Sequence, residues 1–187
     1  MANRMTSGTN SRTGVISAEK LTAYPTFEGL GPADAARVIQ DMTRMNFDAD
    51  STILHEGKSI QALWIILSGE CTVVRQAEDG SEMVLAELRV GDVFGEMSFV
   101  RTAPHSATIR AKTSVSVCTY TREDFMKLAA EHPGAAFRIC SNIAAVLSER
   151  LQRMDAWICQ LVDRPEAVSH RDEWQTFRSA VYSNWNF

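Results

Sequence analysis

The chain has 187 residues, of which 45% are hydrophobic and 22% charged, and it carries a formal net charge of -4. This composition is that of a globular protein with one domain and appendages, and the acidic balance disfavours a general binder of nucleic acids or membrane surfaces. No apolar stretch approaches the roughly 20 residues that span a bilayer, so we expect no membrane segment.

The N-terminal region predicts a disordered segment followed by a short helix. Residues 1–18 are rich in Ser, Thr, Asn and Gly and lack the apolar core of a secretory signal. Pro32 suits the first turn of a helix, where its missing N–H costs nothing. The following apolar residues then fall near one helical face, at Ala35, Val38, Ile39, Met42 and Met45.

Short β-like runs separated by glycines and acidic turns extend from Phe47 to Tyr120. SIQALWIILSG and ECTVVRQ meet at residues 68–70, and MVLAEL follows a turn signal at residues 78–80. ATIRA and VSVCTY complete the set. Many short strands with regular turns favour an antiparallel sandwich, barrel or roll.

Helical patterns return at Thr121, which forms a variant of the capping box with Asp124. Pro133 separates this helix from a longer one that runs to about Val162. The longer helix has apolar residues in alternating steps of three and four, at Ala144, Leu147, Leu151, Met154, Ile158 and Leu161. A period of about 3.5 residues is typical of a two-helix seam, and a helix packed on its own β-structure shows a similar stripe.

We therefore expect three parts: a disordered segment over residues 1–18, a domain over residues 19–162 that includes the long helix, and an aromatic tail over residues 163–187. The tail places apolar side chains on one helical face, at Trp174, Phe177, Val181 and Tyr182. Such a face predicts a segment that folds back on the domain or binds another subunit or a partner.

The run GDVFGEMSFVRTAPHSATIRA, at residues 91–111, carries the functional information. Gly91 and Gly95 permit tight turns and close backbone approach. The segment that follows can expose backbone N–H groups at a helix start, where they bind anions such as phosphate. Glu96 is suited to accept hydrogen bonds from a sugar hydroxyl. A glycine-shaped turn beside a solvated Glu would also explain the run.

Together with Gly57 in ILHEG, Gly69 in LWIILSGE and Phe125 in TREDF, this run resembles the phosphate-binding cassette of the cyclic-nucleotide-binding domain family, in particular its catabolite-activator-like effector domains. The resemblance covers roughly residues 20–160. It implies an α+β fold: an antiparallel β-roll, of the double-stranded β-helix or jelly-roll type, flanked by an N-terminal helix and C-terminal helices.

The resemblance also implies a binding site for cAMP or cGMP. Glu96 would bind the ribose 2′-hydroxyl, Ser106 would hold the cyclic phosphate with the cassette amides, and Ala107 would be the small residue behind the phosphate. The implied ligand-binding residues are Gly95, Glu96, Met97, Ser98, Arg101, His105, Ser106 and Ala107.

His105 departs from the family pattern, which has a phosphate-pairing Arg at this position. Arg offers a permanent charge and a bidentate fork, whereas His charges appreciably only near or below a pH of about 6.5. Losing such a buried bond costs on the order of 2–5 kcal/mol. Protonated-His binding of a nucleotide, a different ligand and an empty roll all remain open, and Arg101 is either a compensating cation or a solvated side chain.

Other functions fit the sequence less well. The cysteines have no metal-site or disulfide spacing and indicate reduced structural thiols in a cytoplasmic protein, at Cys71, Cys118, Cys140 and Cys159. His55 and Glu56 are adjacent, which disfavours a metal site on a strand. No G-x-S-x-G elbow or Cys–His–Asp set points to an enzyme. The C-terminal tail is too short for a winged helix-turn-helix and is not basic, so we expect no direct DNA binding.

The sequence thus predicts a regulatory sensor that binds a nucleotide or another small anionic ligand and relays binding through its C-terminal helices. One alternative is a ligandless module that binds a protein partner or forms a homodimer. Another is a transcriptional regulator that lacks its own DNA-binding domain. The expected dimer or relay residues are Leu147, Leu151, Met154, Ile158 and Leu161.

Overall fold

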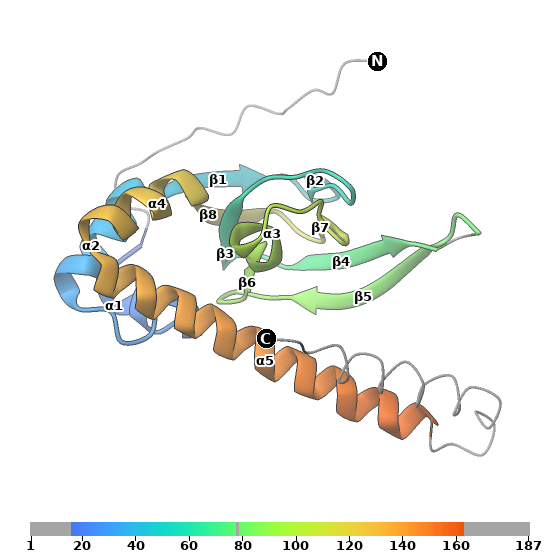
Figure 1. Cartoon of the computed structure of the whole chain (residues 1–187). Coiled ribbons are helices and arrows are strands. Elements are labelled where there is room, and N and C mark those ends of the chain that lie inside the picture. The colour runs from blue at the N-terminus through green and yellow to red at the C-terminus, as the bar shows by residue number, and fades with distance from the viewer. Residues whose placement is uncertain (1–15, 78, 163–187) are drawn as a thin grey trace. The chain divides into compact units, whose positions relative to one another are not determined.

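The computed structural model describes residues 16–77 and 79–162 (Figure 1). The chain divides into two compact units, residues 1–143 and 144–187. Most of the predicted disordered segment and the whole aromatic tail lie outside the described residues. The limits of the three predicted parts therefore stay predictions.

The strands of the described chain form two antiparallel four-stranded sheets, which confirms the expected α+β roll. The first sheet has the order β1-β8-β3-β6, with β1 at Thr43–Phe47, β8 at Val115–Thr121, β3 at Ala62–Ser68 and β6 at Val93–Phe94. The second has the order β2-β7-β4-β5, with β2 at Thr52–Leu54, β7 at Thr108–Ala111, β4 at Cys71–Gln76 and β5 at Glu82–Leu88.

Two short α-helices and a 3₁₀ turn precede the roll, one short helix lies within it, and two helices follow it (Figure 1). They are α1 at Ala18–Thr22, the 3₁₀ turn η1 at Pro25–Phe27, α2 at Pro32–Asp41, α3 at Glu96–Val100, α4 at Arg122–Glu131 and α5 at Pro133–Val162. Pro32 begins α2, as predicted. The predicted cap of α4 is also confirmed, because the Thr121 hydroxyl accepts a 3.1 Å hydrogen bond from the backbone N–H of Asp124.

The predicted helical face before the roll extended too far along the chain. Helix α2 ends at Asp41, and Met42 already has an extended backbone with ψ of 144°. Met45 therefore lies in β1, where it pairs with Val117 of β8 and packs against the roll's core. Backbone pairing with a distant strand ended the helix, although the apolar spacing continued.

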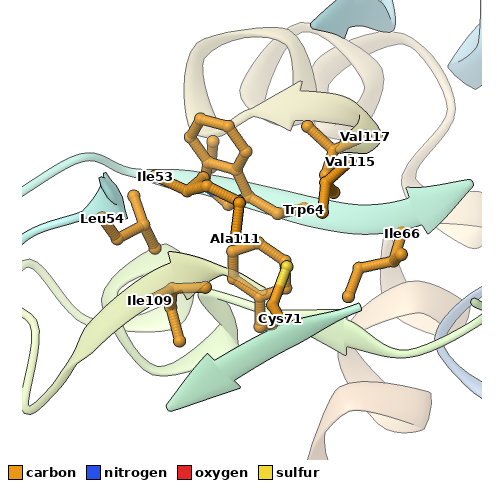
Figure 2. Close-up of a cluster of buried hydrophobic side chains, with 11 residues drawn as sticks. Ile53, Leu54, Trp64, Ile66, Cys71, Ile109, Ala111, Val115 and Val117 are labelled. Atoms are coloured by element: carbon orange, nitrogen blue, oxygen red, sulfur yellow. The ribbon is translucent and has the colours of Figure 1, made fainter. Parts of the chain in front are cut away.

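The core of the roll gathers around Trp64, as Figure 2 shows. Its indole ring stacks on Phe94 at 5.9 Å between centroids and 12° between planes. Phe47 lies at a tilted angle on Trp64, 6.4 Å away. The cluster's buried members are Ile53, Leu54, Ala62, Trp64, Ile66, Cys71, Phe94, Ile109, Ala111, Val115 and Val117. Since Phe94 is the last residue of β6, this packing fixes the point at which the chain enters residues 95–107.

Strand β3 is buried on both faces. Trp64 faces the roll's interior, while the alternate residues Leu63 and Ile65 are also fully buried. On the paired strand β8, the Cys118 sulfur lies 3.9 Å from the sulfur of Met42 at the end of α2. The first sheet is thus covered on both faces, by the roll's interior on one side and by buried contacts such as that with Met42 on the other. This burial on both faces explains the nearly continuous apolar run of β3.

Candidate functional site

Residues 95–107, called the cassette here, begin at a glycine that no other residue could replace without strain. Gly95 has φ of 84°, in the left-handed region, and precedes α3 directly. A Cβ atom at this position would lie 2.5 Å from the carbonyl oxygen of Ala62 and 2.9 Å from Cδ1 of Trp64. The backbone at the start of the cassette therefore packs directly against β3, with no room for a side chain at residue 95.

Helix α3 alternates between buried and exposed side chains. Glu96, Ser98 and Phe99 are buried, whereas Met97 and Val100 are exposed. The segment is thus a short helix and not an extended edge strand, and Glu96 is not directed into bulk solvent. Both features are those that a ligand-binding cassette requires.

Ser98 connects α3 to the loop that precedes β3. Its hydroxyl lies within hydrogen-bond distance of two carbonyl oxygens and can donate to that of Gly95 at 3.1 Å or that of Ile60 at 3.3 Å. The Ser98 side chain is buried. In this structure Ser98 therefore contacts the protein's own backbone and stabilises the position of the cassette.

His105 is buried and bonded to the same loop. Its Nε2 accepts a hydrogen bond of 3.1 Å from the backbone N–H of Ile60. Its backbone N–H donates to the carbonyl oxygen of Lys58 at 2.7 Å, and its carbonyl oxygen accepts from the N–H of Gly57 at 2.9 Å. Burial lowers the pKa of His105 below its ordinary value of 6.5. The ring is accordingly neutral and already has a hydrogen-bond partner within the protein.

The remaining predicted ligand residues lie nearer the surface. Arg101 and Ser106 are exposed, and Ala107 is half-buried just before β7. The structure thus buries Glu96, Ser98 and His105, of which Ser98 and His105 both bond to Ile60, and leaves Arg101 and Ser106 exposed.

Contacts that the sequence analysis missed join the cassette to α4. Phe99 of α3 meets Phe125 of α4 edge to face, at 5.2 Å between ring centroids. Arg122, the first residue of α4, donates from its guanidinium to the carbonyl oxygens of Phe99 and Val100 at the end of α3. Its backbone N–H also donates to the carbonyl oxygen of Gln61 at 2.9 Å. No motif marks Arg122 in the sequence, because its partners lie more than 20 residues away in the chain.

The predicted apolar stripe of α5 is exposed at two of the three dimer or relay positions whose side chains the structure describes. Leu151 is 55% exposed and Met154 is 53% exposed, while Leu147 is half-buried. The side chains of Ile158 and Leu161 lie outside the described residues. Within the part of α5 whose side chains the structure describes, Leu151 and Met154 are thus exposed at the predicted spacing.

Within residues 16–77 and 79–162, no group of three or more His, Cys, Asp and Glu side chains is placed to hold a metal ion. No helix in that part of the chain is long and apolar enough to cross a membrane. Cys71 and Cys118 are buried free thiols, as the sequence predicted, whereas Cys140 is exposed.

Comparison with known proteins identifies the roll and its cassette. Residues 44–132 match the family described as cyclic nucleotide-binding domain. The cAMP-activated global transcriptional regulator CRP of Salmonella typhimurium is 30% identical over 142 residues, which cover 69% of this chain and 68% of the relative. The cyclic AMP receptor protein of Thermus thermophilus is 30% identical over 131 residues, covering 70% of this chain and 59% of that protein.

Solved structures agree with this assignment. The catabolite activator protein of Thermus thermophilus has a TM-score of 0.65 at 30% identity, covering 73% of this chain and 62% of its own. A cyclic nucleotide-binding domain from Methylobacillus flagellatus has a TM-score of 0.70 at 20% identity, covering 76% of this chain and 83% of its own, and supports the fold. The chain is a regulatory domain and not an enzyme, and it belongs to the cyclic nucleotide-binding domain family.

Proposed function

We propose that this chain is a cytoplasmic sensor whose cassette binds a cyclic nucleotide, cAMP or cGMP, or another small anionic ligand, and whose trailing helices relay the binding. The Salmonella relative is named as cAMP-activated, which supports the ligand class. In this proposal Glu96 accepts hydrogen bonds from a sugar hydroxyl, and Ser106 and the cassette amides receive the anionic group. Gly95, Met97 and Ala107 shape the surrounding surface.

The observation that carries the proposal is the direct bonding between α3 and the first turn of α4. Arg122 holds the carbonyl oxygens at the end of α3, and Phe99 packs on Phe125. A ligand that binds α3 more tightly in one position of α4 than in another shifts the population between them. These residues supply a contact through which binding at the cassette can bias the position of α4.

Titration calorimetry with cAMP and cGMP tests the ligand assignment. We expect saturable binding by the full chain and a loss of about 10- to 100-fold in affinity for Glu96→Gln, because a hydrogen bond to a charged group contributes about 1.5–3 kcal/mol. Glu131→Gln, at an exposed position of α4, is the matched control and should bind as the wild type does. Absence of saturable binding of either nucleotide, with the fold intact by circular dichroism, refutes the assignment.

A second role, homodimerisation through α5, is favoured by the exposed stripe. Leu151 and Met154 repeat at the spacing of a two-helix seam, and an exposed Leu or Met at successive seam positions gains free energy by pairing with a second copy. We expect Leu151→Glu to halve the mass measured by light scattering after gel filtration. Gln152→Glu, one residue off the stripe, should leave the mass unchanged. A wild-type protein that is monomeric at all accessible concentrations removes this role.

A further inference from the structure

We propose that His105 is a positioning residue whose neutral ring fastens Ile60, in the loop of residues 57–61, to the cassette, and that acid breaks this bond. The position is the one at which the family pattern places a cation for the ligand's phosphate. In this chain the ring instead bonds to the protein's own backbone. The part of the inference that concerns ligand affinity rests on the function proposed above, whereas the fastening itself does not.

Within the loop, Ile60 is bonded at both its backbone N–H and its carbonyl oxygen. The N–H of Ile60 donates to Nε2 of His105 at 3.1 Å, and the carbonyl oxygen of Ile60 lies 3.3 Å from the hydroxyl of Ser98. Ser98 is near the start of the cassette and His105 near its end. The backbone of Ile60 therefore connects the start of the cassette, at Ser98, to its end, at His105.

Only one of the bonds made by His105 depends on its side chain. The backbone bonds to Gly57 and Lys58 would survive any substitution that preserves the local fold, since they use the main chain of residue 105. The bond to Ile60 requires an acceptor at the position of Nε2. His105 thus adds a side-chain fastening to a backbone pairing that already sets the distance.

The bond also defines the ring's protonation state. An Nε2 atom that accepts a hydrogen bond carries no proton, so the ring proton must be on Nδ1. Protonation of Nε2 would set two N–H donors against each other inside a buried site. The imidazolium form is therefore incompatible with the bond to Ile60, and the ring cannot serve the loop and an anionic ligand through Nε2 at the same time.

Surrounding charges do not change this conclusion. The charged or titratable groups on the elements around His105 are His55, Glu56 and Lys58 before β3, Glu96 and Arg101 of the cassette, Arg110 of β7 and Arg122 of α4. Lys58 and Arg101 are exposed, and Glu56 lies 3.6 Å from Arg75. Burial is the physical cause that lowers the pKa of His105.

The sign of the pH effect follows from this lowered pKa. The unfolded or released state takes up a proton near a pH of 6.5, before the fastened state does. The fastening is therefore complete above that pH and is lost as the pH falls through the lower pKa of the fastened state. If the cassette binds an anion, its affinity should weaken in acid, because Ile60 is then no longer bonded to the ring of His105.

Amide hydrogen exchange and ¹⁵N NMR of the full chain test the fastening without any ligand. We expect the Ile60 amide to be protected at pH 7.5 and to lose up to about tenfold in protection, after correction for intrinsic exchange, at pH 5.5. The imidazole ¹⁵N shifts should show the Nδ1–H tautomer at pH 7.5. Protection of Ile60 that is equal at the two pH values, or an Nε2–H tautomer, overturns the proposal.

Two variants separate positioning from simple packing. His105→Gln keeps an acceptor that cannot take up a proton in this range, so Ile60 should remain protected at both pH values. His105→Ala removes the acceptor, so Ile60 should exchange rapidly at both. His55→Ala, at an exposed site, is the control and should keep the wild-type pH profile. Should His105→Gln lose protection in acid as the wild type does, another group is responsible.

Calorimetry with cAMP at the same two pH values tests the consequence for the ligand. We expect the wild-type affinity to fall, by up to about tenfold, between pH 7.5 and 5.5 and that of His105→Gln to stay constant. If cAMP binds neither protein, the proposed ligand fails while the exchange data still decide the role of His105. If wild-type affinity rises in acid, the ring serves the ligand and not the loop, and the proposal is refuted.

Discussion

Replacement of Gly95 by Ala tests how tightly the cassette is built against β3. Two separate penalties are expected at this position. The first is conformational, because a φ of 84° is left-handed and costs an L-residue about 1–2 kcal/mol. The second is steric, because the new Cβ would lie 2.5 Å from the carbonyl oxygen of Ala62 and 2.9 Å from Cδ1 of Trp64.

The steric penalty can be isolated with a second glycine. Gly80 has φ of 82°, but a Cβ there meets nothing within 4 Å. Gly80→Ala should therefore cost only the conformational part, about 1–2 kcal/mol. Overpacking adds about 1–3 kcal/mol, so the total for Gly95→Ala is about 2–5 kcal/mol.

Urea unfolding followed by circular dichroism measures the difference. With a slope of about 2 kcal/mol per molar urea, Gly80→Ala should lower the midpoint by about 0.5–1 M and Gly95→Ala by about 1–2.5 M. The slopes should stay the same. If the two variants lose equal stability, the close approach of Gly95 to β3 carries no energetic weight, and the packing argument for the cassette fails.

Three further measurements probe other parts of the molecule. Burial raises the pKa of the Cys118 thiol to about 12, so Ellman's reagent at pH 8 should modify the exposed Cys140 quickly and Cys118 only after unfolding; equal rates would contradict the burial. The side-chain amide of Asn142 donates to two carbonyl oxygens of residues 26–28 at 2.9 and 3.3 Å, and Asn142→Ala should lower the free energy of unfolding by about 0.5–1.5 kcal/mol in urea titrations, whereas no change would show that these bonds contribute nothing. Because the pKa of His105 is lowered in the folded state, the wild type should lose more stability than His105→Gln between pH 7.5 and 5.5, and parallel losses would speak against it.

Most of the fold could be predicted because its signals are local. Glycines and acidic turns separated the strands, and Gly69 and Gly80 do adopt positive φ at two of these turns. The Thr121 cap and the break at Pro133 set the starts of α4 and α5. The short elements α1 and η1 were not predicted, because five- and three-residue helices carry too little pattern and depend on buried contacts such as those of Leu21.

The site was less predictable than the fold. The position of Glu96 at the start of a short helix followed from the motif, and its burial agrees with a binding role. The partner of His105 did not follow from any motif, because Ile60 is 45 residues away and contributes only a backbone N–H. Every residue except proline offers that group, so no sequence pattern can reveal which one the ring binds.

The attachment of Arg122 to the end of α3 gives α4 the geometry of a lever. The guanidinium of the first residue of this ten-residue helix makes these bonds, so the far end at Glu131 is about 13.5 Å from the pivot along the helix axis. A tilt of about 10° at the pivot would carry that end through about 2.4 Å, a little under half the pitch of a helical turn. A tilt of this size at Arg122 would therefore reach the start of α5 at Pro133 as a displacement of about 2 Å.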